Sequence, residues 1–257
     1  MRLVRYRDTS TSVVRPGIVD GHTVYAVKGD IFAGATKGDA IGSLDDVTLT
    51  TPIQPGKIIC VGLNYAAHVT ENDPTRQVPE EPVIFMKPTS TLIGPGETIE
   101  IAHPGNRTDY EAELVVVIGK SARDVAEADA LSYVLGYTAG NDVSDRYLQK
   151  KDGQWIRAKG FHTYCPLGPW IETDLDISDL KVQSRLNGQV KQSQTTASMI
   201  WKVPFLISYI GRFTTLDPGD IILTGTPEGV GPMQAGDTIE IEIGGVGTLS
   251  NPVANRS

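Results

Sequence analysis

The sequence predicts a β-rich α+β fold, and three observations indicate it. The chain has 257 residues, of which 40% are hydrophobic and 21% charged, as in an ordinary folded domain. Its 27 glycines and 16 prolines divide the apolar residues into short runs, a texture typical of many strands joined by turns. These runs do not alternate regularly with helical segments, which argues against a doubly wound sheet or a TIM barrel.

The first fifty residues predict a small N-terminal unit. Short strand patterns occur at Leu3–Tyr6, Gly17–Asp20 and Thr23–Val27, with a weaker element at Ile31–Ala35. The segment Thr51–Gly56 carries two prolines and a glycine and is interpreted as a linker. We therefore expect one domain over residues 1–51 and a larger one over residues 52–257.

The larger domain opens with an apolar strand, Lys57–Val61. Three acidic, glycine-containing turns each precede a predicted strand, and glycine supplies the positive φ that such turns need. These turns begin the segments Gly94–Ile99, Asp217–Ile222 and Gln234–Ile239. Two helices are predicted, one from Val125 to about Tyr137 and one at Ala197–Gly211, whose apolar residues recur at helical spacing.

The most informative segment is Asp109–Leu114, which runs directly into the apolar stretch Val115–Gly119. Side chains of a strand alternate between faces, so Glu111 and Glu113 point the same way. Two like charges beside a buried run repel each other and are costly to desolvate. Taken alone, the pattern is more often a solvated strand edge, but a bound divalent cation would remove both costs.

A third carboxylate is available at Asp142, which follows the apolar segment Tyr133–Ala139. Three protein oxygens together with water and substrate would complete an octahedral magnesium or manganese site. Asp145 is a rival ligand. Asn-Asp and Ser-Asp pairs also commonly form turns or helix caps, and this alternative stays open on the sequence alone.

Two further groups are candidates for chemistry. His68 and Glu71 are three residues apart and share a helix face, which is the arrangement of a general base oriented by a carboxylate. The polar, proline-bearing segment Asn72–Glu81 that follows predicts a mobile loop. Lys159 is a candidate for stabilising a substrate oxyanion; the alternative is a surface lysine whose stem lies on Phe161.

The glycine-rich segment Thr224–Gly231 follows the predicted strand Ile221–Leu223 and offers backbone amides to an anion. It lacks the Gly-Lys-Ser/Thr ending of a phosphate-binding loop, and no G-x-G-x-x-G motif opens a helix. The sequence therefore argues against an ATP site and against a Rossmann cofactor.

Charge and cysteine usage exclude other classes. The net charge of −8, without a lysine or arginine run, disfavours nucleic acid and anionic membranes. No apolar stretch is long enough to cross a bilayer, and we expect no signal peptide. Cys60 and Cys165 lie far apart and form no C-x-x-C motif, so we expect a reducing, cytoplasmic environment.

Several of these segments together resemble the fumarylacetoacetate hydrolase family, in particular its short bacterial members and their acylpyruvase relatives. The matching motifs, in order, are Gly62-x-Asn64-Tyr65-x-x-His68-x-x-Glu71, Pro82-x-x-Phe85-x-Lys87-Pro88, Tyr110-Glu111-x-Glu113-Leu114, Asn141-Asp142-x-Ser144-x-Arg146, Ala158-Lys159-x-Phe161 and Leu223-Thr224-Gly225-Thr226-Pro227-x-Gly229-Val230-Gly231. Independent motifs in one order make a stronger signal than any motif alone.

The resemblance implies a mixed β-roll or sandwich domain with a small N-terminal α+β domain, in a homodimer. It implies magnesium or manganese held by a trio of carboxylates, and a dyad on a lid. It also implies four contacts to the carboxylate and oxo groups of a 2-oxo acid. These residues are Glu111, Glu113 and Asp142 for the metal, His68 and Glu71 for the dyad, and Arg146, Gln149, Lys159 and Thr226 for the substrate.

The expected reaction is hydrolysis of the carbon–carbon bond of an acylpyruvate-type 2,4-dioxo acid. His68 with Glu71 would activate the water, and Lys159 would stabilise the pyruvate enolate. Two reactions that use the same site stay open: isomerisation of 2-hydroxyhepta-2,4-diene-1,7-dioate, as in aromatic catabolism, and decarboxylation of oxaloacetate. A different class, a non-catalytic, metal-dependent binder of oxo acids, would have no need of the dyad.

Overall fold

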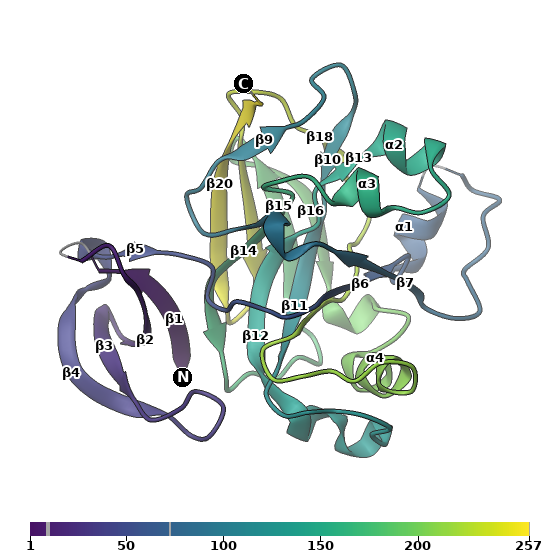
Figure 1. Ribbon diagram of the computed structural model, residues 1–257. Coiled ribbons are helices and arrows are strands. Elements are labelled where there is room, and N and C mark those ends of the chain that lie inside the picture. The colour runs from purple at the N-terminus through teal and green to yellow at the C-terminus, as the bar shows by residue number, and fades with distance from the viewer. Residues whose placement is uncertain (9–10, 72, 257) are drawn as a thin grey trace.

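The computed structural model describes residues 1–8, 11–71 and 73–256, and its main feature is one large sheet (Figure 1). The sheet has twelve strands among the described residues, in the order β4-β3-β2-β1-β14-β12-β11-β17-β6-β7, with β5 on β1 and β8 on β14. Its strands are β1 (Arg2–Arg7), β2 (Val14–Asp20), β3 (Thr23–Lys28), β4 (Thr36–Ser43), β5 (Thr48–Leu49), β6 (Ile58–Gly62), β7 (Val83–Lys87), β8 (Leu92–Ile93), β11 (Ala112–Ile118), β12 (Val134–Asn141), β14 (Cys165–Glu172) and β17 (Ile221–Leu223).

Two smaller sheets complete the β structure, with the orders β16-β15-β19-β20-β9 and β13-β10-β18. Their strands are β9 (Ile99–Ile101), β10 (Thr108–Tyr110), β13 (Ser144–Asp145), β15 (Lys181–Leu186), β16 (Gln189–Thr195), β18 (Gly231–Pro232), β19 (Thr238–Ile243) and β20 (Gly247–Asn255). The five-stranded sheet packs on the central strands of the large sheet, so the main domain is a β sandwich with few helices. The predicted β-rich α+β class is confirmed.

Short helices lie around this sandwich. They are α1 (Ala66–Thr70), α2 (Arg146–Lys151), α3 (Ile156–Lys159) and α4 (Val203–Gly211), with 3-10 helices η1 (Leu44–Asp46), η2 (Thr89–Thr91), η3 (Glu127–Tyr133) and η4 (Thr196–Ser198). In Figure 1, α1, α2 and α3 gather at one end of the sandwich and α4 lies near the other. None of the helices in the described part of the chain is long and apolar enough to cross a membrane.

Strand β11 is the centre of the core. It is buried on both faces, because Leu114, Val116 and Ile118 pack into the cluster shared with the five-stranded sheet and α4. Val115 and Val117 pack into a second cluster on the opposite face. This continuous apolar run anchors the residues that immediately precede it, so the segment carrying Glu111 and Glu113 is held firmly.

The N-terminal strands agree with three of the four predicted elements. The strands β1, β2 and β3 contain the predicted segments, and β1 joins the large sheet by pairing Leu3 with Ile171 of β14. The helical part of this unit is the 3-10 helix η1. The weak element predicted at Ile31–Ala35 is wrong: that segment is a turn followed by irregular chain, and the strand is β4 (Thr36–Ser43). This strand ends the sheet and is largely exposed, so it lacks an apolar pattern.

Both predicted helices were too long. The first consists of the 3-10 helix η3, and the chain from Val134 onward is strand β12, paired with β11 and β14. Gly136 permits this pairing, because a Cβ there would lie 2.5 Å from the carbonyl oxygen of Glu172. The second begins only at Val203, because Pro204 occupies the first turn of α4, where proline is favoured.

The three predicted acidic turns are confirmed. Gly96, Gly219 and Gly236 have φ values of 76°, 90° and 95°. Strands β9, β17 and β19 follow these turns. Glycine is therefore needed there for its backbone conformation, and the local pattern located each strand correctly.

Candidate metal centre and active site

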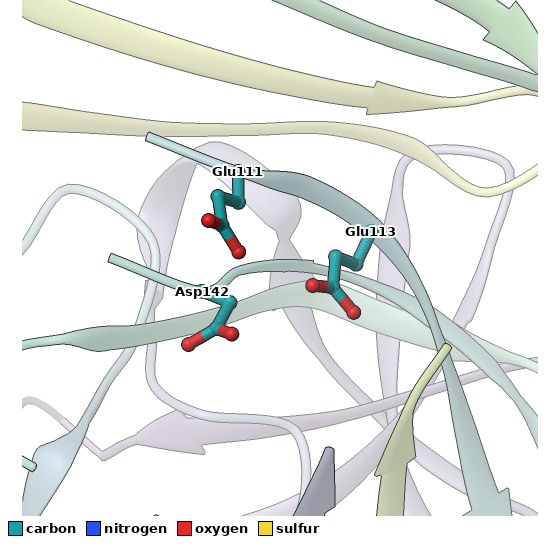
Figure 2. Close-up of side chains that lie close together, drawn as sticks. All are labelled: Glu111, Glu113 and Asp142. Carbon is teal, nitrogen blue, oxygen red and sulfur yellow. The ribbon is translucent and has the colours of Figure 1, made fainter. Parts of the chain in front are cut away.

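Three buried carboxylates converge where β11 begins (Figure 2). Glu113 lies on β11, Glu111 directly precedes that strand, and Asp142 directly follows β12. One carboxylate oxygen of each residue lies within 4.8 Å of the others. The backbone fixes this arrangement, because the Asp142 N–H donates to the Glu111 carbonyl at 3.0 Å. The predicted shared face of Glu111 and Glu113 and the predicted proximity of Asp142 are therefore both observed.

Two buried lysines balance part of this charge. The Lys159 Nζ donates to the Glu111 Oε2 at 2.9 Å and also to the Asp142 carboxylate. The Lys87 Nζ donates to the Asp142 Oδ1 at 2.6 Å and to the Val143 carbonyl at 3.2 Å. Lys159 is 2% exposed, so the alternative of a surface lysine is wrong. The sequence assigned no role to Lys87, although it lies in the quoted Phe85-x-Lys87-Pro88 motif.

The three carboxyl groups differ in their electrostatic environment. Burial would raise the pKa of Glu111, but Lys159 and Arg146 outweigh burial and hold that pKa well below its usual value. Burial raises the pKa of Glu113, and the carboxylates of Asp142 and Glu111 raise it further. Among the described residues Glu113 forms no ion pair; it accepts the Gly225 N–H at 2.6 Å. The trio therefore has a place for one more positive charge, beside Glu113.

This donor set fits a hard divalent cation. All three ligands are carboxylates, which magnesium and manganese prefer. The trio is buried, so bulk water does not compensate the charge of Glu113. A cation at this position would favour the ionised form of Glu113, which burial opposes. Glu111, Glu113 and Asp142 are the residues that would hold it.

Arg146 connects the trio to the rest of the site. Its Nη1 contacts the Glu111 Oε1 at 2.7 Å and the Gln149 Oε1 at 2.8 Å, and its Nε donates to the Asp109 Oδ2 at 2.8 Å. The remaining nitrogen, Nη2, is buried and has no hydrogen-bond partner among the described residues. A buried guanidinium N–H without a partner is costly, so this nitrogen is available to a bound anion.

His68 and Glu71 form the predicted pair. His68 lies on α1 and Glu71 caps the end of that helix, which places the His68 Nδ1 3.0 Å from the Glu71 Oε2. The second carboxylate oxygen of Glu71 accepts the Gly229 N–H at 2.7 Å. Burial raises the pKa of Glu71, but the hydrogen bonds from His68 and Gly229 outweigh it, so the pKa is below its usual value. Glu71 is thus a fixed, charged partner for the histidine.

The glycine-rich segment Thr224–Gly231 donates two of its backbone amides to carboxylates of the chain itself. Gly225 donates to Glu113 and Gly229 donates to Glu71. The loop therefore positions one member of the acidic trio and one member of the dyad. The sequence predicted anion contacts there and did not identify these acceptors.

Two cavities meet at these residues. The inner one, of about 30 Å³, is lined by the acidic trio, His68, Arg146, Gln149, Lys159 and Thr226. Eight of the nine predicted site residues thus line one cavity. The ninth, Glu71, is hydrogen-bonded to His68. The outer cavity, of about 320 Å³, shares Leu63, His68, Arg146, Gln149 and Trp155 with the inner one.

Thr226 and Asp145 are engaged with the protein itself. The Thr226 hydroxyl donates to the Ala112 carbonyl at 2.9 Å and accepts from the Gln192 Nε2 at 2.7 Å, so its single proton is already used. Asp145 was a rival metal ligand on the sequence. It caps α2 by accepting the Leu148 N–H at 3.0 Å and is not part of the trio. The alternative of a helix cap is therefore correct for Asp145.

The predicted loop Asn72–Glu81 borders the outer cavity through Asp73 and Arg76. Residue 72 lies outside the described residues, and the mobility of the loop stays a prediction. The two cysteines are free and buried. Burial raises the pKa of Cys165 to about 12, as expected for an unreactive thiol.

The chain matches known families over nearly its whole length. Residues 57–254 match the family model described as fumarylacetoacetate (FAA) hydrolase C-terminal, and residues 1–52 match one described as Rv2993c-like, N-terminal. Among curated proteins, oxaloacetate tautomerase fahd2, mitochondrial, of Xenopus laevis is 44% identical over 224 residues, covering 82% of this chain and 70% of that protein.

Two solved structures are similar over 100% of both chains. The 5-carboxymethyl-2-hydroxymuconate delta-isomerase from Mycobacterium smegmatis has a TM-score of 0.90 and 44% identity. The maleylpyruvate hydrolase from Sphingobium sp. SYK-6, solved in complex with manganese(II) ion and pyruvate, has a TM-score of 0.81 and 31% identity. These relatives share one fold and are named for different reactions.

Proposed function

Because this chain belongs to the fumarylacetoacetate hydrolase family, as its motifs predicted, we propose that it is a divalent-metal-dependent enzyme that hydrolyses the carbon–carbon bond of acylpyruvate-type 2,4-dioxo acids. The observation that carries this proposal is the pair of His68 and Glu71, hydrogen-bonded at 3.0 Å, beside a buried carboxylate trio. A histidine oriented by a carboxylate is suited to activating water, and hydrolysis needs an activated water.

Glu111, Glu113 and Asp142 would hold magnesium or manganese. The manganese and pyruvate in the structure of the maleylpyruvate hydrolase support this assignment. When bound, the ion would act as a Lewis acid toward the carboxylate and 2-oxo oxygens of the substrate.

The cationic residues of the site would bind and orient the substrate. The unpartnered Nη2 of Arg146 is available to the substrate carboxylate. Gln149 accepts from Arg146 and thereby fixes the plane of the guanidinium. Lys159, buried beside the trio, would stabilise the negative charge that develops on the 2-oxo oxygen as the carbon–carbon bond breaks.

His68 would accept a proton from water, and the resulting nucleophile would attack the distal carbonyl of the substrate. Its Nδ1 is bonded to Glu71, which leaves Nε2 as the atom that takes the proton. His68 would then transfer this proton to the carbon of the departing pyruvate enolate. The products are a carboxylic acid and pyruvate. Thr226 would line the inner cavity with a hydroxyl group of fixed orientation, because its proton is donated to the Ala112 carbonyl.

A second candidate is proton transfer without hydrolysis, as in a tautomerase or isomerase. It is favoured by the similarity to the oxaloacetate tautomerase and the hydroxymuconate isomerase, each 44% identical to this chain. The same trio and Lys159 would stabilise an enolate in that reaction, in isomerisation of 2-hydroxyhepta-2,4-diene-1,7-dioate and in decarboxylation of oxaloacetate. We rank hydrolysis first because the dyad is intact.

The assignment to a homodimer, to the cytoplasm and to domains at residues 1–51 and 52–257 belongs to the same proposal. The change between the two matching family models, between residues 52 and 57, supports the domain boundary. Light scattering of the purified protein at several concentrations would give the oligomeric state.

The deciding experiment is an assay of acetylpyruvate turnover with magnesium or manganese and again with EDTA. We expect metal-dependent loss of the enol absorbance together with stoichiometric pyruvate. Enol loss without pyruvate would identify a tautomerase. Absence of turnover of acetylpyruvate, combined with turnover of oxaloacetate or of a 2-hydroxy-dienedioate, would replace hydrolysis by the second candidate.

The raised pKa of Glu113 predicts how stability depends on pH. Its ordinary value is 4.5, and the folded, metal-free protein holds this proton more tightly than the unfolded chain does. The free energy of unfolding therefore falls as pH rises above about 4.5, until pH passes the folded pKa. Manganese should compensate the ionised carboxylate, so its stabilising effect should be larger at pH 8 than at pH 6.

Thermal denaturation with EDTA and with manganese, at both pH values, measures this effect. Glu113→Gln is the matched control, because it cannot ionise at this position. The difference between the wild-type protein and this variant isolates Glu113 from other titrating groups. Equal pH dependence in the two proteins would show that Glu113 is not the group responsible.

A further inference from the structure

Asp109 opens the row of acidic residues that leads into β11, and it is the member of that row outside the carboxylate trio. Asp109, Glu111 and Glu113 are spaced two residues apart, which is the alternation that places side chains on one face. The Asp109 side chain is fully buried. A buried carboxylate needs compensating partners, so the partners of Asp109 indicate what it does.

Asp109 is bonded to two guanidinium groups. Its Oδ2 accepts from the Arg146 Nε at 2.8 Å. Arg107 forms a bidentate pair with its Oδ1 and Oδ2, at 2.8 and 2.9 Å. The Arg107 side chain is 50% exposed and lies outside the inner cavity, whereas Arg146 lines that cavity. Arg107 thus compensates the charge of Asp109, and Arg146 is the group through which Asp109 can act on the site.

The backbone fixes the contact between Asp109 and Arg146. Asp109 is the middle residue of β10, where it pairs with Ser144 of β13 and with Pro232 of β18. The Arg146 N–H donates to the Arg107 carbonyl at 2.9 Å, at the point where β13 leads into α2. Both partners are therefore attached to one small sheet, which sets their separation.

The contacts of Arg146 leave one nitrogen free in a defined direction. Asp109 holds Nε, while Glu111 and Gln149 hold Nη1 at 2.7 and 2.8 Å. A planar guanidinium that is fixed at two nitrogens cannot turn, so the position of the third, Nη2, is determined. Nη2 is buried and has no hydrogen-bond partner anywhere in the part of the chain that the structure describes. Without Asp109 the group would be held at Nη1 alone and could pivot about it.

Glu111 cannot take over the role of Asp109, because it is also a candidate metal ligand. Its carboxylate is shared between Arg146, Lys159 and the cation that the trio would hold. Asp109 lies outside the trio, so a cation would leave its contact with Arg146 in place. Asp109 is therefore the acidic partner of Arg146 that metal binding does not engage.

We propose that Asp109 is a positioning residue, which fixes the plane of the Arg146 guanidinium so that Nη2 is directed at a carboxylate bound in the inner cavity. Asp109 does not line that cavity, so it acts through Arg146 and not by touching the ligand. The identification of this ligand as the head of a 2-oxo acid rests on the proposed function. A donor that is already fixed loses less conformational freedom on binding, which raises the affinity.

Oxalate binding to the manganese-loaded protein tests this role without relying on turnover. Asp109→Asn keeps the shape of the side chain but removes its charge and one acceptor oxygen. In calorimetry we expect this variant to bind oxalate about tenfold more weakly, close to the contribution of one hydrogen bond to a charged group. The affinity for manganese alone should change little, because Asp109 is not a member of the trio.

The matched control is Asp152→Asn. Asp152 also forms a bidentate pair with an arginine, Arg157, at 2.6 and 2.7 Å, and both residues lie outside the two cavities. Loss of this pair should leave the affinity for oxalate unchanged.

A double-mutant cycle shows whether Asp109 acts through Arg146. Arg146→Leu alone should weaken oxalate binding more than Asp109→Asn does. Adding Asp109→Asn to the Arg146→Leu protein should cause little further loss, because no guanidinium is left to orient. A general disturbance of the fold would instead weaken oxalate by a similar factor in both backgrounds.

Arg146→Lys is a second test that leaves Asp109 untouched. Lysine keeps the positive charge but has no plane that a partner can fix. If the orientation of the guanidinium matters, this variant should also bind oxalate about tenfold more weakly, the size expected for one charge-assisted hydrogen bond.

Unchanged oxalate affinity in Asp109→Asn would overturn the positioning role. So would equal losses with and without Arg146, or wild-type affinity in Arg146→Lys. A parallel fall in the affinities for manganese and oxalate would assign Asp109 to supporting the trio instead. Acetylpyruvate turnover tests the hydrolase proposal separately: a protein that shows the coupling but yields no pyruvate would keep the positioning role and lose the proposed reaction.

Discussion

Replacement of His68 by alanine is expected to lower kcat for acylpyruvate cleavage by about 10²–10⁴-fold, the usual loss when a general base is removed. His68 lines both cavities and is the member of the dyad whose free ring nitrogen can take a proton from water. It is not a member of the carboxylate trio, so the affinity for manganese and for oxalate should change little. The loss should therefore appear in kcat and not in binding.

Glu71→Gln should fall between wild type and His68→Ala, because it keeps the hydrogen bond to His68 but loses the charge. His22→Ala is the matched control, since His22 is also bonded to an acidic side chain, Asp45 at 2.8 Å, but far from the site in the N-terminal unit. Unchanged acylpyruvate turnover in His68→Ala would show that the dyad does not activate water. The metal-assisted proton-transfer reactions would then become the better assignment.

Two members of the carboxylate trio could be placed on one face from the sequence, because their geometry is local. Glu111 and Glu113 share a face through the two-residue period of a strand, and the apolar run after them ensures burial. The third member was ambiguous, since Asp142 and Asp145 lie three residues apart. Only the start of α2 decides between them: Asp145 caps that helix, and Asp142 completes the trio with Glu111 and Glu113.

The ion-pair partners of the cationic residues could not be predicted from the sequence, because these pairs join residues that are distant along the chain. Lys87 reaches Asp142 across 55 residues, and Lys159 reaches Glu111 across 48. Arg107 and Asp109 are close in sequence and form an ion pair. The same Asp109 carboxylate also accepts from Arg146, which is distant along the chain. A lysine or arginine in a sequence is more often exposed, so tertiary packing decides its role.

The errors in the fold have similar origins. Val134–Asn141 was assigned partly to a helix, yet it is a strand because β11 and β14 flank it and supply the hydrogen bonds. Tertiary pairing thus outweighed a weak local pattern. At α4 the local signal was sufficient: Pro204 marks the first turn of the helix and should have set its start.

Replacement of Lys159 by methionine is expected to reduce turnover by about 10²–10³-fold, comparable to the loss of one donor that stabilises an oxyanion. Methionine keeps an unbranched side chain that is one atom shorter than that of lysine, whose Nζ lies 4.8 Å from the centre of the Phe85 ring. The change therefore removes a charge and leaves little empty space. Lys120→Met, at an exposed position, is the matched control.

The same variant should be less stable without metal, and the remaining contacts set the size of the effect. Loss of one partner of a buried ion pair costs about 3–5 kcal/mol. The lower end applies here, because Glu111 keeps Arg146 at 2.7 Å and Asp142 keeps Lys87 at 2.6 Å. Burial lowers the pKa of Lys159, but Asp142 and Glu111 raise it above its usual value, so the wild-type side chain is charged at neutral pH.

Metal affinity separates the two roles that Lys159 could have. A lysine that only assembles the trio would leave a weaker metal site when removed. In the structure its charge lies within hydrogen-bonding distance of two of the three carboxylates, so it also repels a cation bound there. We therefore expect the Lys159→Met variant to bind manganese at least as tightly as the wild-type protein does, although its turnover is strongly reduced. A parallel loss of metal affinity and activity would instead assign Lys159 to holding the carboxylates in place.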